Sequence, residues 1–243
     1  MSLVRVDRDG AVAVIRLDRD EKLNAISNAM ERELHEALVS DEVRSSRAVV
    51  VTGEGRAFSA GADITEFADL DPAAILRYYR ETGGVYEEFA TLSQPTIAAI
   101  HGYCLGGGLE LALAADLRIA DESATLGFPE VGLGILTSSG GTLRATRILG
   151  PAQAKRLILL GERLTAEEAL AVGLVTELAA DAMSRALELA RRLAELPPTA
   201  VEVAKAAVDA AAESSRDTMV LVERLAYGFL AQTPEAHDAV ERF

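Results

Sequence analysis

The segment after the apolar run Thr96–Ile100 reads Gly102-Tyr103-Cys104-Leu105-Gly106-Gly107-Gly108-Leu109-Glu110-Leu111, a strand-to-helix junction rich in glycine. The run has the composition of a buried strand, and the residues after the glycines favour a helix. Glycines at such a junction let the backbone approach a ligand and leave free amides at the helix N-terminus. Such amides suit an anion or a developing oxyanion. Close packing of a helix start against a strand is the alternative explanation.

Known cofactor loops do not fit these glycines. In the dinucleotide-binding pattern, the third glycine counted from Gly106 would be residue 111, which is Leu. No Gly-Lys-Ser/Thr follows the run, so the phosphate-binding loop is excluded as well.

Two glutamates occupy apolar, glycine-rich surroundings. Glu110 falls in the first turn of the expected helix, and Glu130 follows in Phe128-Pro129-Glu130. A first-turn glutamate can complement the helix dipole, or it can act as a general acid or base with a raised pKa. A further strand-to-loop junction lies at Ala57–Ile64. Two carboxylates flanking exposed amides are typical of acid–base chemistry beside an oxyanion.

The rest of the chain alternates strands with helices and then becomes helical, which predicts an α/β core with a helical C-terminal part. Expected strands are Val4–Asp7, Ala11–Leu17, Ala48–Thr52, Thr96–Ile100, Leu117–Ala120, Thr125–Gly127 and Leu174–Leu178. Expected helices are Ser27–Val39, Pro72–Leu92 with a break at Gly83-Gly84, Leu109–Ala115, Pro151–Leu160, Thr165–Gly173, Asp181–Leu196, Thr199–Glu213 and Arg216–Ala231. Thr165-Ala-Glu-Glu168 predicts a capping box.

Composition excludes several classes of protein. The 243 residues carry 38 acidic and 24 basic side chains, a net charge of −14, which argues against binding to nucleic acid or to anionic membranes. One cysteine, Cys104, rules out an internal disulfide, and three scattered histidines give no support for a metal site. No apolar run is long enough to span a bilayer, and the N-terminus shows no signal peptide. The expected location is the cytoplasm.

Taken together, the segments resemble the crotonase superfamily, the enoyl-CoA hydratase/isomerase family, over nearly the whole chain. The blocks that carry the resemblance are Lys22–Ile26, Arg56–Ile64, His101–Leu111, Phe128–Gly134, Gly140–Arg144, Leu159–Leu164 and Ala169–Val175. The resemblance implies a ClpP/crotonase-like fold, a spiral of ββα units with a C-terminal helical region. Residues 1–180 would form the core with the CoA-thioester site. Residues 181–243 would form a helical oligomerisation region of the same structural unit, giving a homotrimer or homohexamer.

In this family two backbone amides bind the thioester oxygen, and the matching positions are Ala62 and Gly107. Two glutamates hold and activate water, and these match Glu110 and Glu130. The position whose amide also contacts the water falls on Ser138. Hydratases usually carry Pro-Gly-Ala-Gly-Gly there, whereas this chain has Thr-Ser-Ser-Gly-Gly at 137–141. The serine side chain brings volume and a hydroxyl group to that place.

The CoA end of the site is expected at the loop before Thr65. The resemblance places Lys22, Arg56, Ala60, Asp63 and Ile64 there, with Arg56 near the CoA phosphates and the carbonyls near Ala60 and Ile64 against adenine. Some hydratases carry a lysine at the position of Thr65, so one cation is missing. The acyl pocket is expected between Leu70 and Phe89 and the C-terminal helices. There Tyr78, Tyr79 and Tyr86 would line it or a helix packing face.

The resemblance implies reversible hydration of a 2-enoyl-CoA to a 3-hydroxyacyl-CoA by a hydro-lyase. CoA is then part of the substrate, and no separate cofactor or metal is needed. Double-bond isomerisation, thioester hydrolysis and decarboxylation are alternatives on the same fold, and a non-catalytic acyl-CoA-binding subunit is a remoter one. A serine hydrolase is disfavoured because Ala57 replaces the first glycine of the nucleophile elbow around Ser59.

Overall fold

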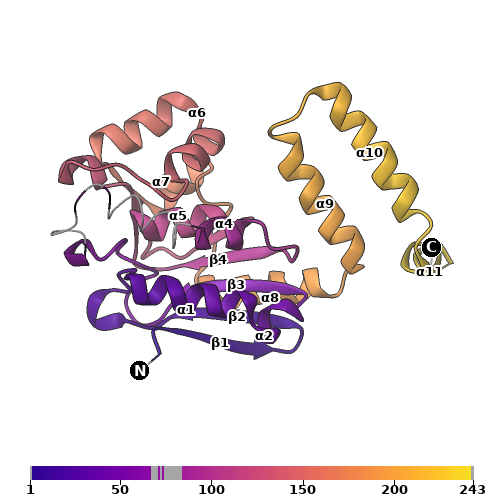
Figure 1. Ribbon diagram of the computed structural model, residues 1–243, viewed down its shortest axis with the longest axis horizontal. Helices are drawn as coiled ribbons and strands as arrows, with labels where there is room; N and C mark the ends of the chain where they lie inside the picture. Colours follow the sequence, from indigo (N-terminus) through magenta and orange to yellow (C-terminus); the bar gives the residue numbers. More distant parts are fainter. Residues whose placement is uncertain (1, 67–70, 72, 74–83, 242–243) are drawn as a thin grey trace.

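A six-stranded sheet with helices on both faces forms the centre of the molecule (Figure 1). The computed structural model describes residues 2–66, 71, 73 and 84–241. Its strand order is β1-β2-β3-β4-β6-β9. These strands are β1 (Val4–Asp9), β2 (Val12–Leu17), β3 (Ala48–Gly53), β4 (Thr96–Ile100), β6 (Leu117–Ala120) and β9 (Glu177–Leu178). β1 and β2 form an antiparallel hairpin, and every later pairing is parallel.

Alternating side chains of the central strands feed two separate apolar cores. Ile15 of β2 and Val51 of β3 belong to the larger core, while Val14 and Val50 belong to the smaller one. Successive side chains of a strand point to opposite faces, so a run that is apolar throughout is buried on both sides. The continuous apolar strands predicted from sequence therefore require cover on both faces.

The larger core is covered by α1 (Asn28–Val39), α4 (Val85–Ala90), α5 (Gly107–Ala114), α6 (Gly141–Leu160) and α7 (Ala166–Ala171). A short α2 (Asp41–Arg44) follows α1. The sequence predicts only the second half of α6, after the bend at Gly150 and Pro151. The first half was missed because its sequence lacks a clear helical pattern of apolar residues. The caps predicted at Ser27 and Thr165 are present, each accepting a backbone hydrogen bond.

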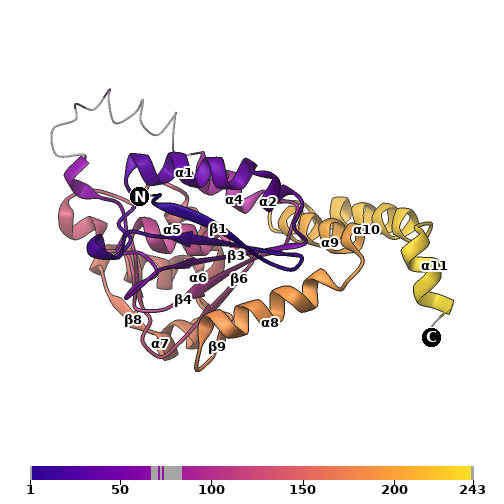
Figure 2. The same ribbon diagram turned by 90° about the horizontal axis from the view of Figure 1, so that it is seen from below.

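α8 (Ala182–Ala194) covers the opposite face of the sheet from α1 (Figure 2). Its Ala182, Ala186 and Ala190 recur at four-residue spacing and pack on Val12, Val50 and their neighbours. This helix belongs to the core of its own chain, so the boundary expected at residue 180 falls inside one packed unit. The helices that leave the core begin at Pro198: α9 (Pro198–Ala211), α10 (Arg216–Leu230) and α11 (Pro234–Glu241) (Figure 1).

A second sheet of three strands lies beside the first, in the order β5-β7-β8. Its strands are β5 (Tyr103–Leu105), β7 (Thr125–Gly127) and β8 (Arg163–Thr165). The sequence predicts β7 and neither β5 nor β8, whose three residues each become strands by pairing with β7. Three turns of 3-10 helix complete the description: η1 (Asp20–Lys22), η2 (Ile64–Glu66) and η3 (Glu130–Leu133).

The structure tests the helix expected at Pro72–Leu92 only in part. Most of that helix, with Tyr78 and Tyr79, lies outside the described residues, and only its end is seen, as α4. Among the residues that are described, no helix combines the length and apolarity that crossing a membrane demands.

Candidate active site

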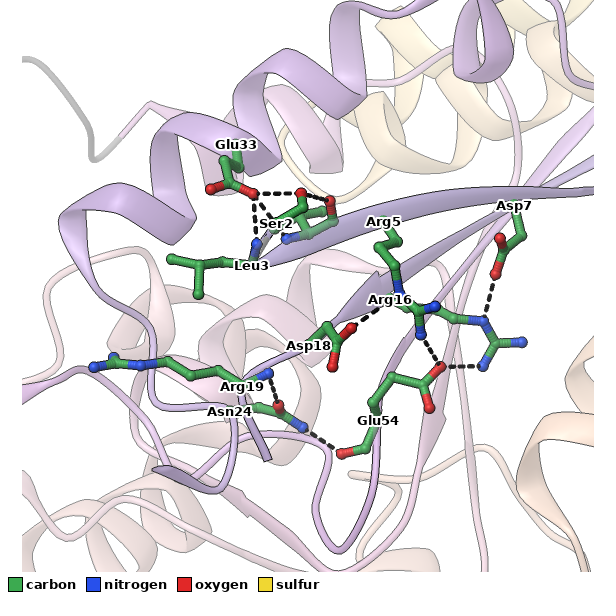
Figure 3. Close-up of polar contacts among 11 residues, drawn as sticks. Ser2, Leu3, Arg5, Asp7, Arg16, Asp18, Arg19, Asn24, Glu33 and Glu54 are labelled. Carbon is green, nitrogen blue, oxygen red and sulfur yellow. Dashed lines mark hydrogen bonds and ion pairs between the residues drawn. The ribbon is translucent and has the colours of Figure 1, made fainter. Parts of the chain in front are cut away.

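The loop after β3 is fixed by buried polar side chains (Figure 3). The Asn24 side chain accepts from the Arg19 amide at 2.8 Å and donates to the carbonyls of Glu54, at 2.8 Å, and Ala57, at 2.7 Å. Ser59 Oγ donates to the Asn24 carbonyl at 2.8 Å and accepts from the Gly61 amide at 3.2 Å. The Ser59 hydroxyl thus holds the loop in place, and no nucleophilic role is left for it.

Glu54, on the same loop, is anchored to the sheet (Figure 3). Its carboxylate receives Arg5 at 3.0 Å and Arg16 at 3.1 Å. Exposed ion pairs of this kind contribute little individually, but two cations on one carboxylate fix its position. The loop leading to Ala62 is therefore held at both its buried and its exposed side.

The loop brings the Ala62 amide next to the glycine-rich start of α5. A Cβ built on Gly107 would lie 3.4 Å from the Ala62 nitrogen, and one built on Gly61 would lie 3.5 Å from the Gly107 nitrogen. Gly61 has φ of +105°, a left-handed conformation that side chains rarely adopt. Among the described residues, neither amide donates to another group of the protein. Two neighbouring free amides can bind one oxyanion.

Glu110 is buried at the start of α5 and is held by the segment before α6. Its Oε1 accepts from the amides of Ser139 at 2.7 Å and Gly141 at 2.8 Å. Burial raises the pKa of Glu110, while the amides of Gly141 and Ser139 and the charge of Arg144 act in the opposite direction. A Cβ on Gly141 would lie 2.8 Å from Glu110 Oε1, so a larger residue there would displace the Glu110 carboxylate.

Glu130 lies at the start of η3 and is only 8 % exposed. Burial, together with the nearby charge of Glu110, raises the pKa of Glu130 to about 7. Its Oε2 is buried without a hydrogen-bond partner in the described part of the chain. A Cβ on Gly106 would lie 3.0 Å from Glu130 Oε1, so the carboxyl is directed at the glycine-rich junction.

The two glutamates therefore differ in environment although they share one site. The amides of Gly141 and Ser139 and the charge of Arg144 support the charged form of Glu110, whereas at Glu130 only its own backbone amide does so. Burial raises the pKa of both carboxyls, but at Glu110 more groups oppose that rise. Different surroundings for two carboxyls in one site suit an acid and a base acting together.

Ser138 lies beside Glu110, as its place in the sequence suggests. Its amide helps to lower the pKa of Glu110, and the residue itself is exposed. The closest amides on the carboxylate, however, belong to Ser139 and Gly141. Water contact by Ser138 stays a prediction.

The residues expected to bind CoA lie near one another, but their side chains differ in availability. Lys22 is exposed at the end of η1, and Ile64 is exposed at the start of η2. Arg56 pairs with Asp20, contacting it through Nε at 3.3 Å and through the backbone amide at 2.9 Å. Ala60 donates its amide to the Leu23 carbonyl and keeps its own carbonyl for other partners.

Asp63 differs from a ligand-facing residue. Its carboxylate is buried against Arg19 at 2.9 Å and Thr65 Oγ1 at 2.6 Å, and both hold the pKa of Asp63 below its usual range. Its side chain therefore orders the loop, and its backbone does the same, because the Asp63 amide donates to the Ile26 carbonyl and the Asp63 carbonyl accepts from the Glu66 amide. The CoA contact expected for Asp63 stays a prediction.

Tyr86, expected to line the acyl pocket or a helix packing face, borders the glycine-rich junction, and Arg144 joins the site although its place in the sequence suggests no role there. The Tyr86 hydroxyl would lie 3.3 Å from a Cβ on Gly107, and Arg144 hydrogen bonds to the Ser139 carbonyl at 2.9 Å. A lone tyrosine on an expected helix carries no spacing signal. Arg144 could be found only as part of the Gly140–Arg144 block.

No cluster of three or more His, Cys, Asp or Glu that could hold a metal occurs in the ranges that the structure describes. Cys104 is fully buried, and burial raises the pKa of its thiol, so it is a packing residue.

Comparisons with known proteins agree with this geometry. The model of the family described as "Enoyl-CoA hydratase/isomerase" matches residues 7–243. A short-chain-enoyl-CoA hydratase of Clostridium acetobutylicum is 35 % identical over 99 % of this chain and 94 % of its own. A 2,3-dehydroadipyl-CoA hydratase of Escherichia coli is 36 % identical over 100 % and 96 %.

A solved structure extends the agreement to the fold. The crystal structure of enoyl-CoA hydratase from Thermoplasma volcanium GSS1 superposes with a TM-score of 0.95 at 34 % identity, covering 100 % of this chain and 98 % of that chain. The predicted crotonase fold is confirmed, and this chain belongs to the crotonase superfamily, in the enoyl-CoA hydratase/isomerase family.

Proposed function

We propose that the protein catalyses the reversible hydration of a 2-enoyl-CoA to a 3-hydroxyacyl-CoA. The observation that carries the proposal is the pair of buried glutamates with unequal environments, Glu110 and Glu130, beside the free amides of Ala62 and Gly107. The relatives named as hydratases support the same reaction.

The unequal environments assign the two roles. Glu110, with two amides on its carboxylate, is the base that takes a proton from water as the water oxygen bonds to Cβ. The electron pair of the double bond moves toward the thioester, and the Ala62 and Gly107 amides bind the resulting enolate oxygen. Glu130, whose pKa of about 7 keeps a proton available, donates that proton to Cα. The sum is one water added and no net charge.

Isomerisation is less well supported. One carboxylate is enough to move a proton between the α and γ carbons, and the relatives compared above are named as hydratases. A second buried glutamate has a use in adding water and none in shuttling a single proton.

Water addition involves no change of oxidation state, so we propose that the reaction needs no cofactor besides the CoA of the substrate. We place the CoA moiety along the loop from Ala60 to Ile64, with Lys22 and Arg56 near its phosphates. Full activity after dialysis against a chelator would support the absence of a further cofactor, and a loss of activity restored by a metal would contradict it. The cytoplasmic location stays a prediction.

We also propose that the chain assembles with copies of itself as a trimer or hexamer. α9 and α10 stand away from the core (Figure 1). Leu221, Leu225 and Phe229 of α10, four residues apart, are each more than half exposed. Such a stripe on one helix face is typical of a surface that another chain covers.

The decisive experiment is a spectroscopic assay with crotonyl-CoA, following loss of the ultraviolet absorbance of the conjugated enoyl thioester. We expect turnover by the parent, and a drop of about a hundredfold or more in Glu110→Gln and Glu130→Gln, because each removes one proton-transfer group. Binding of a saturated acyl-CoA, measured by calorimetry, should persist in both variants. Binding without turnover of any enoyl-CoA by the parent would contradict the proposal and favour a binding subunit.

A further inference from the structure

Arg144, near the start of α6, contacts two separate parts of the site. Its Nη1 donates to the Ser139 carbonyl at 2.9 Å, and its Nη2 pairs with Glu87 Oε2 of α4 at 2.6 Å. The Arg144 side chain is only 14 % exposed, whereas its partner Glu87 is largely exposed. A guanidinium presents several donors in a fixed plane, so it can hold two acceptors in a set geometry.

The carbonyl that Arg144 holds belongs to the segment that positions Glu110. The amide of the same residue, Ser139, donates to Glu110 Oε1 at 2.7 Å, and the amide of Gly141 donates at 2.8 Å. Gly140 between them has φ of +95°, and a Cβ there would collide with the Arg144 guanidinium. The backbone is thus shaped to admit this side chain.

We propose that Arg144 is a positioning residue for the reaction: its guanidinium holds the Ser139–Gly141 segment against Glu110 and ties it to α4 through Glu87. The inference rests on the proposed hydration and adds a residue to it. α4 also carries Tyr86, whose hydroxyl borders Gly107. Through Glu87, Arg144 therefore connects the segment that holds the base with the helix that borders the oxyanion site.

The charged groups around Arg144 define what its loss would do. Arg144 on α6 and Glu130 on η3 face Glu110, and Glu87 on α4 faces Arg144. The cavity beside Arg144 is further lined by Asp116, Arg118, Arg147, Asp209 and Glu213. The charge of Arg144 holds the pKa of Glu110 lower than burial alone would leave it. Without that cation, protonation of Glu110 becomes easier and the base is lost at higher pH.

The test is the pH dependence of crotonyl-CoA hydration by Arg144→Met, a substitution that keeps much of the apolar volume. We expect kcat to fall about ten- to a hundredfold, because a small displacement of the base has effects of this order. KM should stay within about twofold, and the acidic limb of the profile should move to higher pH. Arg144→Lys should restore the acidic limb but only part of kcat, since an ammonium keeps the charge and loses the planar fork.

Arg147→Met is the matched control. Arg147 lies on the same helix and pairs with Glu213 at 2.9 Å, and it is not among the groups that shift the pKa of Glu110 or Glu130. Its kcat and its pH profile should equal those of the parent. If Arg144→Met kept the parent kcat and acidic limb, or if Arg147→Met changed as much as Arg144→Met, the inference would be overturned.

A second readout separates this inference from the proposed function. Titration of the Glu110 carboxyl by ¹³C NMR, assigned with Glu110→Gln, should show a higher pKa in Arg144→Met than in the parent. A parent that hydrates no enoyl-CoA would end the proposed function, yet an unchanged Glu110 titration would separately end this inference. If Arg144→Met failed to fold, Arg144→Lys and Glu87→Gln would carry the test: parent-like kcat in both would also overturn the inference.

Discussion

At the scale of single residues, the proton on Glu130 limits the rate of hydration as pH changes. Burial and the neighbouring Glu110 charge raise the pKa of Glu130 to about 7. If Glu130 is the acid for hydration, kcat/KM should fall as pH rises through about 7 and the proton is lost. The acidic limb should report Glu110 becoming protonated, and both limbs belong to the coupled pair. A stopped-flow profile of hydration that rises through this range would contradict the assignment.

The same raised pKa costs stability in alkaline solution. An unfolded glutamate ionises at about 4.5, so the free energy of unfolding falls as pH rises from about 4.5 to about 7. The stability associated with the neutral carboxyl is therefore complete at acidic pH and is lost above neutrality. Glu130→Gln removes this titration, and we expect it to be more stable than the parent at pH ~8 by about 1–2 kcal/mol. Near pH ~4 the difference should vanish.

Urea denaturation at the two pH values measures this prediction. The gain would accompany a loss of activity, as expected for a site that holds a carboxyl in an unfavourable environment. Equal stabilities of parent and Glu130→Gln at alkaline pH would mean that Glu130 is not desolvated in solution.

Gly107 is the residue whose substitution tests the amide pair. The Cβ of Gly107→Val would point at the Ala62 nitrogen and the Tyr86 hydroxyl, at 3.4 and 3.3 Å, and its methyl groups would fill the space between the two amides. We expect kcat to fall about a hundredfold or more with weaker acyl-CoA binding, because one oxyanion donor has an effect of that order. Gly84→Val is the matched control, since a Cβ at Gly84 meets nothing within 4 Å. Full activity of Gly107→Val would remove Gly107 from the site.

At the scale of elements, α8 depends on the cap at its first residue. Asp181 accepts from the Ser184 amide at 2.9 Å, and that bond holds the pKa of Asp181 below its usual value. Its stabilisation is present above the pKa of an unfolded aspartate and is lost as pH falls through the folded value. Asp181→Ala should cost about 1 kcal/mol at neutral pH. The cost should reach the whole domain, because α8 covers one face of the sheet.

Asp181→Asn separates the hydrogen bond from the charge. An amide oxygen can still accept from Ser184, so this variant should retain most of the stability and lose the pH dependence. Thermal unfolding at neutral pH, and at a pH below ~3, measures both effects. A parent-like melting temperature for Asp181→Ala would show that the cap is not needed in the packed molecule.

The bounds of the strands and helices show how far local sequence specifies an element. β3, β4, β6 and β7 lie within a residue of their predicted bounds, because each is a buried apolar run with a clear end. β8, the first half of α6 and α11 were missed. Their sequences carry too little periodicity, and pairing with β7 is what makes Arg163–Thr165 a strand.

At the scale of the whole molecule, the exposed face of α10 is the test of assembly. Leu225→Glu places a charge at the centre of the Leu221–Leu225–Phe229 stripe. We expect this variant to shift toward monomer in light scattering after size exclusion, because burying an unpaired carboxylate is costly. Glu223→Lys, a charge change between turns of the same stripe, should leave the parent's state unchanged. A monomeric parent would refute the proposed assembly outright.

The α/β class, the crotonase fold and the family are all readable from the sequence, because they depend on the order of apolar runs, glycine junctions and glutamates along the chain. The sequence also marked Glu110 and Glu130 as candidates, since a carboxylate among apolar residues is conspicuous. The family resemblance also paired Ala62 with Gly107, and the tertiary structure shows the two amides side by side. The different surroundings of the two glutamates and the contact of Arg144 with the Ser139 carbonyl are visible in the tertiary structure alone. The tertiary structure also packs α8 into the core and pairs the Asp63 carboxylate with Arg19. These are contacts between residues far apart in the chain, and their charge and desolvation effects exist only when the elements pack.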